Sequence, residues 1–342
     1  MSEKHTRYVR QEMFAHIGQE GQQRIAASKV LIVGCGALGA AQANLLARAG
    51  VGKLILVDRD ILDWSNLQRQ LLYDESQTEA GLPKVIAAQQ RLQQINSAIE
   101  IDAHILDITA SNIAQYVKQA DLVLDATDNF ETRFLLNDVC LKLGVPWIYG
   151  ACVGSYGLSM NIIPHKTPCL RCLFESIPAP GTTPTCDTAG VIGPIVSMIA
   201  SIQCAEALKF LVGDKAALRE GVVNVDLWQN QLHQLQLTLP RPDCPACQKQ
   251  EWEYLHGERR HTTTVLCGRN TVQVTPQQDE PFSLDNVAAQ LAQIGPTTHN
   301  AFLVRCTLPE HVLTVFRDGR ALIEGTSDPS EARSIYARYI GG

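Results

Sequence analysis

The chain has 342 residues and a formal net charge of −6, with 45% hydrophobic and 19% charged residues. This composition is typical of a globular protein with one large and one small domain, and its acidic balance argues against a broad nucleic-acid-binding surface. The sequence begins without an apolar signal core and contains 11 cysteines. We therefore expect a cytoplasmic protein whose cysteines serve as thiols or metal ligands rather than as structural disulfides.

The stretch from Lys29 to Asp60 carries a nucleotide-binding pattern. A strand-type run precedes the sequence GCGALG, a helical run follows it, and a second strand-type run ends at Asp58. Gly34 permits the tight turn, Gly36 the approach of phosphate, and Gly39 the close packing of the helix on the strand. Asp58 can accept hydrogen bonds from ribose hydroxyls. The pattern predicts a nucleotide site without identifying the nucleotide.

Helical and strand-type runs alternate through the first 250 residues. Residues 1–28 form an amphipathic segment in which Tyr8, Met13, Phe14 and Ile17 are apolar. After the βαβ unit, the patterns predict helices at 83–95, 109–119, 131–143 and 191–212. They predict strands at 99–105, 121–126, 146–151, 156–163, 222–228 and 231–237. The helix at 191–212 contains several polar side chains, which favours a core helix over a membrane span. The alternation predicts an α/β fold with a doubly wound, Rossmann-like sheet in a domain over residues 1–250.

A second, smaller domain is predicted at residues 264–342. The charged stretch 250–262 lacks periodicity and is the best linker candidate. Beyond it the patterns predict strands at 264–267, 271–274, 302–306, 312–316 and 321–324, and helices at 284–294 and 331–339. This order indicates a small α+β module, which we expect to be an accessory recognition domain rather than a second enzyme.

Two CxxC pairs predict a metal site. Cys169 and Cys172 form the first pair, and Cys244 and Cys247 form the second. Two intervening residues allow both thiolates of a pair to bind one tetrahedral zinc ion. A redox pair is the alternative, but such a pair usually starts a helix after a strand, and two in one chain would be unusual. We predict a structural four-cysteine zinc site.

Three charged residues are expected at the carboxyl edge of the predicted sheet, where α/β proteins bind ligands. Arg69 and Lys84 supply positive charge for phosphate groups, and Asp128 follows a buried strand and can bind magnesium. An NAD-dependent oxidoreductase would carry the same glycine pattern and is an alternative. The cations and the metal carboxylate fit a triphosphate better, because hydride transfer needs no metal.

Several motifs make the chain resemble the ThiF/MoeB/HesA superfamily, the prokaryotic relatives of ubiquitin-activating enzymes. They are RYVRQ at 7–11, GCGALG at 34–39, DRD at 58–60 followed by SNLQRQ at 65–70, GLPK at 81–84, ATDNFETR at 126–133, the two CxxC pairs and TCDTAGVIGP at 185–194. The resemblance implies ATP-dependent adenylation of the C-terminal Gly-Gly carboxylate of a small ubiquitin-like sulfur carrier. The products would be an acyl-adenylate and pyrophosphate, in thiamine, molybdopterin or related sulfur transfer.

The resemblance also implies roles for individual residues and a set of cofactors, namely ATP, Mg²⁺ and Zn²⁺. Asp58 would hold the ribose, and the phosphates would be held by Asn66, Arg69, Gln70 and Lys84. Asp128 would bind magnesium. Arg10 would reach the triphosphate of the neighbouring subunit, which makes a homodimer a requirement of catalysis.

Cys186 has two interpretations, which stay open. Some members of the superfamily carry a cysteine here that attacks the adenylate or receives sulfur from a sulfurtransferase or cysteine desulfurase; in others the enzyme stops at the acyl-adenylate. The terminal Gly341-Gly342 matches the ending of a carrier, but a frayed terminus is the simpler expectation. A non-catalytic nucleotide-binding sensor or scaffold is an alternative for the whole chain. The joint presence of the phosphate-binding cations and Asp128 argues against it.

Overall fold

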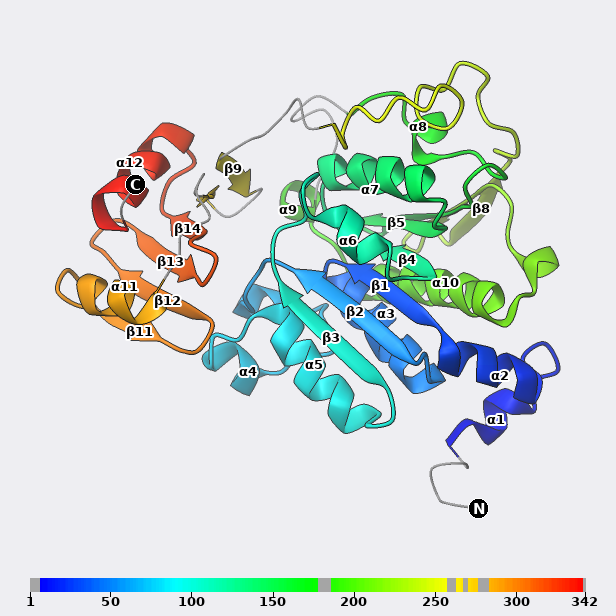
Figure 1. Cartoon of the computed structure of the whole chain (residues 1–342), viewed down its shortest axis with the longest axis horizontal. Helices are drawn as coiled ribbons and strands as arrows, with labels where there is room; N and C mark the ends of the chain where they lie inside the picture. Colours follow the sequence, from blue (N-terminus) through cyan, green and yellow to red (C-terminus); the bar gives the residue numbers. More distant parts are fainter. Residues whose placement is uncertain (1–6, 178–185, 257–262, 267–269, 276–282, 341–342) are drawn as a thin grey trace. The chain divides into compact units, whose positions relative to one another are not determined.

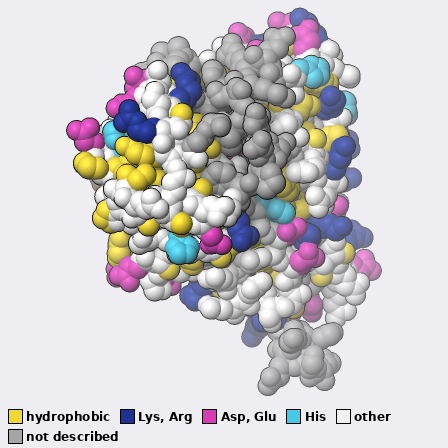
Figure 2. Space-filling view, turned by 60° about the vertical axis from the view of Figure 1, so that its left-hand side comes forward, with side chains coloured by type: hydrophobic (Ala, Val, Ile, Leu, Met, Phe, Trp, Pro, Cys, Tyr) yellow, Lys and Arg dark blue, Asp and Glu magenta, His cyan; other side chains and the backbone are white. Residues whose placement is uncertain are grey.

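The computed structural model describes residues 7–177, 186–256, 263–266, 270–275 and 283–340. The chain divides into two compact units, residues 1–258 and 259–342. Gly341 and Gly342, the end of the linker candidate and part of the loop before Cys186 lie outside the described residues. On the face drawn in Figure 2, the acidic and basic side chains of the described residues are interspersed.

The first unit is an eight-stranded sheet covered by helices on both faces (Figure 1). Its helices are α1 (Val9–Glu12), α2 (Gly18–Ala27), α3 (Ala37–Ala49), α4 (Glu75–Glu79), α5 (Lys84–Ile95), α6 (Ile113–Val117), α7 (Phe130–Leu143), α8 (Leu170–Leu173), α9 (Cys186–Ala189) and α10 (Gly193–Val212), with 3-10 turns η2 (Trp64–Asn66) and η3 (Lys215–Ala217). Its strands are β1 (Lys29–Val33), β2 (Lys53–Asp58), β3 (Glu100–Ile105), β4 (Leu122–Asp125), β5 (Trp147–Val153), β6 (Tyr156–Ile162), β7 (Val222–Asp226) and β8 (Gln231–Leu235).

The strand order is β3-β2-β1-β4-β5-β6-β7-β8. The first five strands are parallel, and β6, β7 and β8 are antiparallel to their neighbours. Alternate side chains of β1 serve two cores: Val30 and Ile32 pack with α3, α5 and α10, whereas Leu31 and Val33 pack with α6 and α7. A strand buried on both faces is apolar throughout, and this continuous apolar run is the pattern from which the strand could be predicted. The predicted doubly wound fold is confirmed.

Helix α10 is the one helix among the described residues that is long and apolar enough to cross a membrane, with a mean hydropathy of 1.6. Of its most apolar window, 56% is buried within the protein. It packs against α3 and β5 in the middle of the first unit. This burial agrees with the prediction of a core helix.

Some predicted elements differ from those observed. The helix expected at 109–119 is shorter, because α6 begins only at Ile113. The preceding residues form a turn in which the Asn112 side chain accepts a hydrogen bond from the Thr109 N–H (2.9 Å) and donates one to the Asp107 carbonyl (2.8 Å). In the amphipathic N-terminal segment, Met13 and Phe14 are 67% and 57% exposed, so they are not core residues of this chain.

The second unit is a six-stranded antiparallel sheet with two helices packed on one face. It contains β9 (Thr263–Leu266), β10 (Thr271–Val274), α11 (Leu284–Leu291), β11 (Thr297–His299), β12 (Leu303–Thr307), β13 (Val312–Phe316), β14 (Ala321–Glu324) and α12 (Pro329–Tyr339). The strand order is β11-β12-β13-β14-β10-β9. Strand β11 was not predicted, since its three residues have no apolar alternation of their own.

Candidate functional site

The carboxyl ends of β1, β2 and β4 meet at one edge of the large sheet. Val33 of β1 pairs with Val57 of β2 on one side and with Asp125 of β4 on the other. The chain runs outward from β1 to β2 and β3, and from β4 to β5 in the opposite direction, so the strand order reverses between β1 and β4. Such a reversal opens the crevice in which α/β proteins bind ligands.

The glycine turn lies at this reversal and requires its glycines sterically. Gly34 has φ +94°, and a Cβ there would lie 2.5 Å from the carbonyl oxygen of Ala126. A Cβ on Gly39 would lie 1.9 Å from the carbonyl oxygen of Gly34. At Gly36 the nearest atom to such a Cβ is the Gln70 Nε2, 3.9 Å away. The turn therefore packs tightly on β4 and opens toward Gln70.

The backbone of Cys35, in the middle of this turn, is held on both sides. Its N–H donates to the Asp58 Oδ2 (2.5 Å), and its carbonyl accepts from the Tyr73 hydroxyl (2.7 Å). Burial raises the pKa of Asp58, although Lys84 opposes the shift. Burial also raises the pKa of the Cys35 thiol, which agrees with packing rather than chemistry. The contact from Tyr73 was not predicted, because nothing local in the sequence marks it.

Two cation–carboxylate pairs line the same edge. The Lys84 Nζ lies 2.7 Å from the Asp60 Oδ2, and Lys84 is only 4% exposed. Arg59 pairs with Asp107 at 3.2 Å. Burial alone would lower the pKa of Arg59, but the carboxylates of Asp107, Asp60 and Asp128 raise it. Positive charge is thus held close to the turn by two carboxylates, Asp60 of the DRD motif and Asp107, of which Asp107 was not predicted.

Asn66 ends η2, and Arg69 and Gln70 follow it, with the Gln70 side chain facing the glycine turn at Gly36. Asn66 and Gln70 are buried, and the Asn66 Nδ2 and Gln70 Oε1 make no hydrogen bond within the part of the chain that the structure describes. Arg69 is half-buried and donates to the Ser65 carbonyl at 2.8 Å. Gln70, which faces this open turn, also donates its backbone N–H to the Asn66 carbonyl. Two buried polar atoms without partners on these residues fit the polar groups of a nucleotide, because such atoms are costly unless a ligand or water pairs them.

Asp128 is exposed just beyond the end of β4, and its Oδ1 accepts a hydrogen bond from the Asn129 side chain at 3.3 Å. Its negative charge contributes to raising the pKa of both Arg59 and Arg133, so it lies near both cations. An exposed carboxylate next to a phosphate site suits Mg²⁺, which is usually bound by one or two carboxylates together with substrate phosphates.

Arg10 is not brought to this edge within one chain. It is exposed on α1, and the neighbouring Gln11 bonds the Ala49 carbonyl at the last turn of α3. Because α3 starts at the glycine turn and has 13 residues, its two ends are about 20 Å apart. Cys186 begins α9, and its side chain lies outside what the structure describes.

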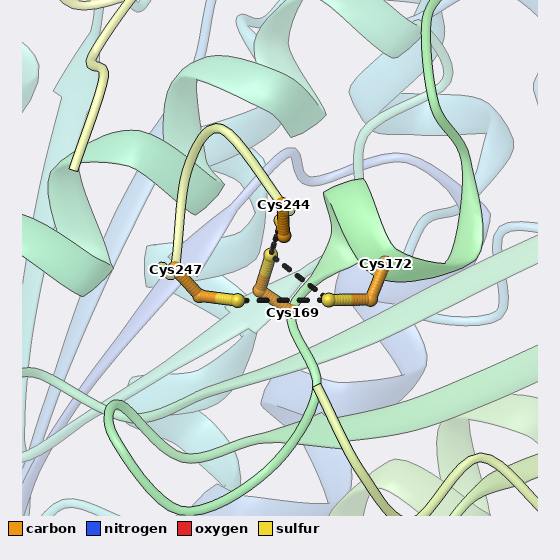
Figure 3. Close-up of side chains that lie close together, drawn as sticks. All are labelled: Cys169, Cys172, Cys244 and Cys247. Carbon is orange, nitrogen blue, oxygen red and sulfur yellow. Dashed lines mark hydrogen bonds between the residues drawn. The ribbon is translucent and has the colours of Figure 1, made fainter. Parts of the chain in front are cut away.

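The four cysteines of the CxxC pairs converge on one point (Figure 3). The Sγ–Sγ distances are 4.0 Å for Cys169–Cys172, 3.6 Å for Cys169–Cys244 and 3.5 Å for Cys172–Cys247. Tetrahedral zinc with Zn–S bonds of about 2.3 Å requires sulfurs about 3.8 Å apart. Hydrogen bonds among the thiols lower the pKa of Cys172 to about 6 and raise the pKa of Cys169 and Cys247. Zinc binds the thiolate form, so its binding would release the protons that the cluster shares. The cluster therefore fits a closed zinc site.

Helix α7 holds the cluster against the sheet. The Leu170 N–H, between the first two cysteines, donates to the Asn137 Oδ1 at 2.9 Å. The next residue, Asp138, is fully buried and accepts from the Tyr254 N–H at 2.9 Å, beyond the second pair. Burial raises the pKa of Asp138 to about 6. Adjacent residues of α7 thus fix the chain on both sides of the metal site.

Asp138→Asn should change how stability depends on pH. A carboxyl whose pKa is raised from 3.8 to about 6 keeps its proton in the folded state after the unfolded chain has lost its own. Wild-type stability should therefore fall by about 3 kcal/mol in total from this group as pH rises from about 3 to about 7, with about 2 kcal/mol of the loss between pH 4 and pH 6. The variant lacks this loss while its amide oxygen can still accept from Tyr254.

The measurement is the melting temperature of both proteins between pH 4 and 7, with the exposed Asp243→Asn as the control. The difference between Asp138→Asn and wild type should shift in favour of the variant as pH rises. A difference that is constant across this range would show that Asp138 does not titrate there.

Comparisons with known proteins agree with the site. The ThiF family matches residues 8–246. The sulfur carrier protein ThiS adenylyltransferase of Bacillus subtilis (strain 168) is 44% identical over 338 residues, which cover 98% of this chain and 99% of that protein. The sulfur carrier protein adenylyltransferase of Thermus thermophilus is 38% identical over 248 residues, 70% of this chain and 90% of that protein.

A solved structure of E. coli MccB with ATP has the same fold as the first unit. Its TM-score is 0.62 at 23% identity, and the match covers 70% of this chain and 74% of MccB. The Bacillus relative, by contrast, extends over both units.

These similarities decide between the interpretations of the sequence. An identity of 44% along nearly the whole of both chains shows that this protein is an adenylyltransferase. The interpretations as an NAD-dependent oxidoreductase and as a non-catalytic sensor are therefore set aside. The chain belongs to the ThiF family.

Proposed function

We propose that this protein uses ATP to adenylate the C-terminal Gly-Gly carboxylate of a small ubiquitin-like sulfur carrier, with release of pyrophosphate. The observation that carries the proposal is the meeting of the glycine turn, two unpartnered buried polar atoms and buried cations at the β1–β4 reversal. The Bacillus relative acts on the carrier ThiS, so a ThiS-like carrier is the first candidate partner.

The chemistry asks little of the protein beyond alignment and charge. A carrier carboxylate is already a nucleophile at neutral pH, so no general base is required. Its oxygen attacks the α-phosphorus of ATP, and the bond to the leaving pyrophosphate breaks. The enzyme must hold the two reactants in line and neutralise the charge that develops on the leaving group.

The proposed nucleotide contacts follow the geometry of the edge. Gly34, Gly36 and Gly39 form the turn that approaches the phosphates. The phosphates are held by Asn66, Arg69, Gln70 and Lys84. Asp58 holds the ribose: each of its oxygens accepts one backbone N–H, from Cys35 and Asp60, and keeps a further lone pair for a hydroxyl. Asp128 would hold Mg²⁺, which when bound neutralises phosphate charge.

A homodimer completes the proposed site. Arg10 cannot serve the site of its own chain, because α1 lies at the far end of α3. Helix α1 and the turn after it expose Val9, Met13 and Phe14 by 41%, 67% and 57%. This apolar, cation-bearing surface supports a second copy of the chain as its partner, with Arg10 directed at the partner's triphosphate.

The test is ATP–pyrophosphate exchange with a panel of carriers, led by a ThiS-like protein. Exchange should require an intact C-terminal glycine, and a carrier without its last residue is the matched control. Exchange that is equally fast without any carrier, or that ignores the truncation, would contradict the proposed substrate.

Cys186 should form a covalent adduct with the carrier. The residues after α9 are attached to the site edge, since the Gly154 N–H donates to the Gly190 carbonyl (2.8 Å) and the Ile192 N–H to the Gly154 carbonyl (3.0 Å). A Cβ on Gly193 would lie 3.9 Å from the Arg69 Cα. These contacts support a Cys186 thiolate that attacks the acyl-adenylate carbonyl, forming a thioester and releasing AMP.

Intact-mass spectrometry after reaction with carrier and MgATP measures the adduct. Cys186→Ala should adenylate the carrier normally without forming the adduct, whereas Cys152→Ala, which removes a buried thiol, should still form it. If wild type forms no adduct, and Cys186→Ala supports full sulfur transfer with a sulfurtransferase or cysteine desulfurase donor, then catalysis ends at the acyl-adenylate.

A further inference from the structure

A buried ion pair stands directly behind the Asp128 loop. Asp125, the last residue of β4, is fully buried, and its Oδ2 lies 3.2 Å from the Nε of Arg133 on α7. Arg133 is 6% exposed, and its guanidinium lies 5.5 Å from the ring centre of Tyr149 and 5.6 Å from that of Phe130. Desolvating the two charges of a buried ion pair costs free energy that their attraction often does not recover. Stability alone therefore does not explain this pair, and we ask what its contacts do.

The pair fixes every polar group of Thr127, the residue before Asp128. The Asp125 Oδ1 accepts from both the Thr127 N–H (2.9 Å) and the Thr127 hydroxyl (2.7 Å). The Arg133 Nη2 donates to the Thr127 carbonyl at 2.5 Å. Thr127 therefore cannot rotate without breaking a charge-assisted hydrogen bond.

The two ends of this loop are anchored as well. The Asp125 carbonyl accepts from the Gln42 side chain (3.1 Å) on α3 and from the Gln203 side chain (3.0 Å) on α10. On the other side, Asn129 caps α7 by accepting from the Thr132 N–H at 2.8 Å. Asp128 is thus the one exposed side chain among residues 125–129. These residues end β4 and form the loop that joins it to α7 (Figure 1).

We propose that Asp125 and Arg133 are positioning residues that act through Thr127 to hold the Asp128 carboxylate where it can bind Mg²⁺. This inference rests on the role proposed for Asp128 and extends it to residues that do not touch the ion. Hydrogen-bonded partners behind a metal ligand typically change metal affinity 10–100-fold when they are replaced, because the ligand loses its fixed orientation.

The test compares the affinity of the full-length protein for ATP with and without Mg²⁺, measured by calorimetry in the absence of a carrier. In Thr127→Val the Mg²⁺-dependent gain in affinity should fall about tenfold, while the affinity for ATP in EDTA stays unchanged. Arg133→Lys should show the same pattern, and Thr127→Ser, which keeps the hydroxyl, should restore the gain. In an Asp128→Asn background, Thr127→Val should have no further effect.

Thr132→Val is the matched control, since it removes a hydroxyl from a half-buried threonine of the same motif but keeps the backbone N–H from which Asn129 accepts a hydrogen bond. Equal Mg²⁺ dependence in Thr127→Val and Thr132→Val would overturn the inference, as would an absence of any Mg²⁺-dependent gain in wild type. Melting temperatures identify a variant that is merely destabilised. If Arg133→Lys is destabilised, the result for Thr127→Val, the milder of the two disruptive changes, decides whether the inference holds. Pyrophosphate exchange by wild type reports on the proposed function separately, because the calorimetry needs no carrier.

Discussion

Replacing either Arg69 or Asp128 by alanine should slow carrier-dependent pyrophosphate release about 10²–10³-fold, the usual cost of one preorganised charge contact in a transition state. Arg69 is half-buried and lies next to the start of α10, and the residue after it, Gln70, faces the glycine turn. Asp128 is exposed on an anchored loop at the same edge. Neither side chain contributes to a hydrophobic core, so both variants should keep the wild-type melting temperature.

Two exposed residues provide matched controls for these variants. Arg91→Ala removes an exposed arginine of α5, and Glu131→Ala removes an exposed carboxylate three residues beyond Asp128. Both should retain wild-type rates. Near-normal pyrophosphate release by Arg69→Ala and Asp128→Ala would remove the catalytic assignment of this edge, even though the family membership would stand.

Cys169→Ser should abolish zinc binding and lower the stability of the first unit by at least about 4 kcal/mol, since loss of a structural metal is among the few single changes with so large an effect. At about 2–4 °C per kcal/mol for a unit of this size, the melting temperature should fall by about 10 °C. The activity of the protein that remains folded should change much less. The cysteine cluster is anchored to Asn137 of α7, and none of its cysteines lines the glycine turn.

Elemental analysis should find one zinc per chain in wild type and in Cys152→Ser, a change at a buried cysteine outside the cluster, and none in Cys169→Ser. A chelator should reproduce the destabilisation in wild type. An iron–sulfur cluster, or a disulfide in either CxxC pair, would refute a structural zinc site.

Most of the large sheet could be predicted because its central strands β1, β2 and β4 are buried and apolar, and because helical runs separate the parallel strands along the chain. The elements that escaped prediction are short or depend on neighbours. Strand β11 has three residues and exists through its pairing with β12. Helix α6 starts late because Asn112 bonds Thr109 and Asp107 in a local turn that competes with the helix.

The sequence by itself determined the parts of the site that depend on local spacing. Glycines at three fixed positions set the turn between β1 and α3, and two residues between cysteines bring both thiols of a pair to one side of a turn. Only the tertiary structure decided which groups hold these parts in place. Tyr73 reaches Cys35 across 38 residues, and Lys84 meets Asp60 across 24. Arg133 meets Asp125 only because α7 packs back on the strand it follows. Such pairings depend on where the chain returns, which the spacing of residues along one segment does not encode.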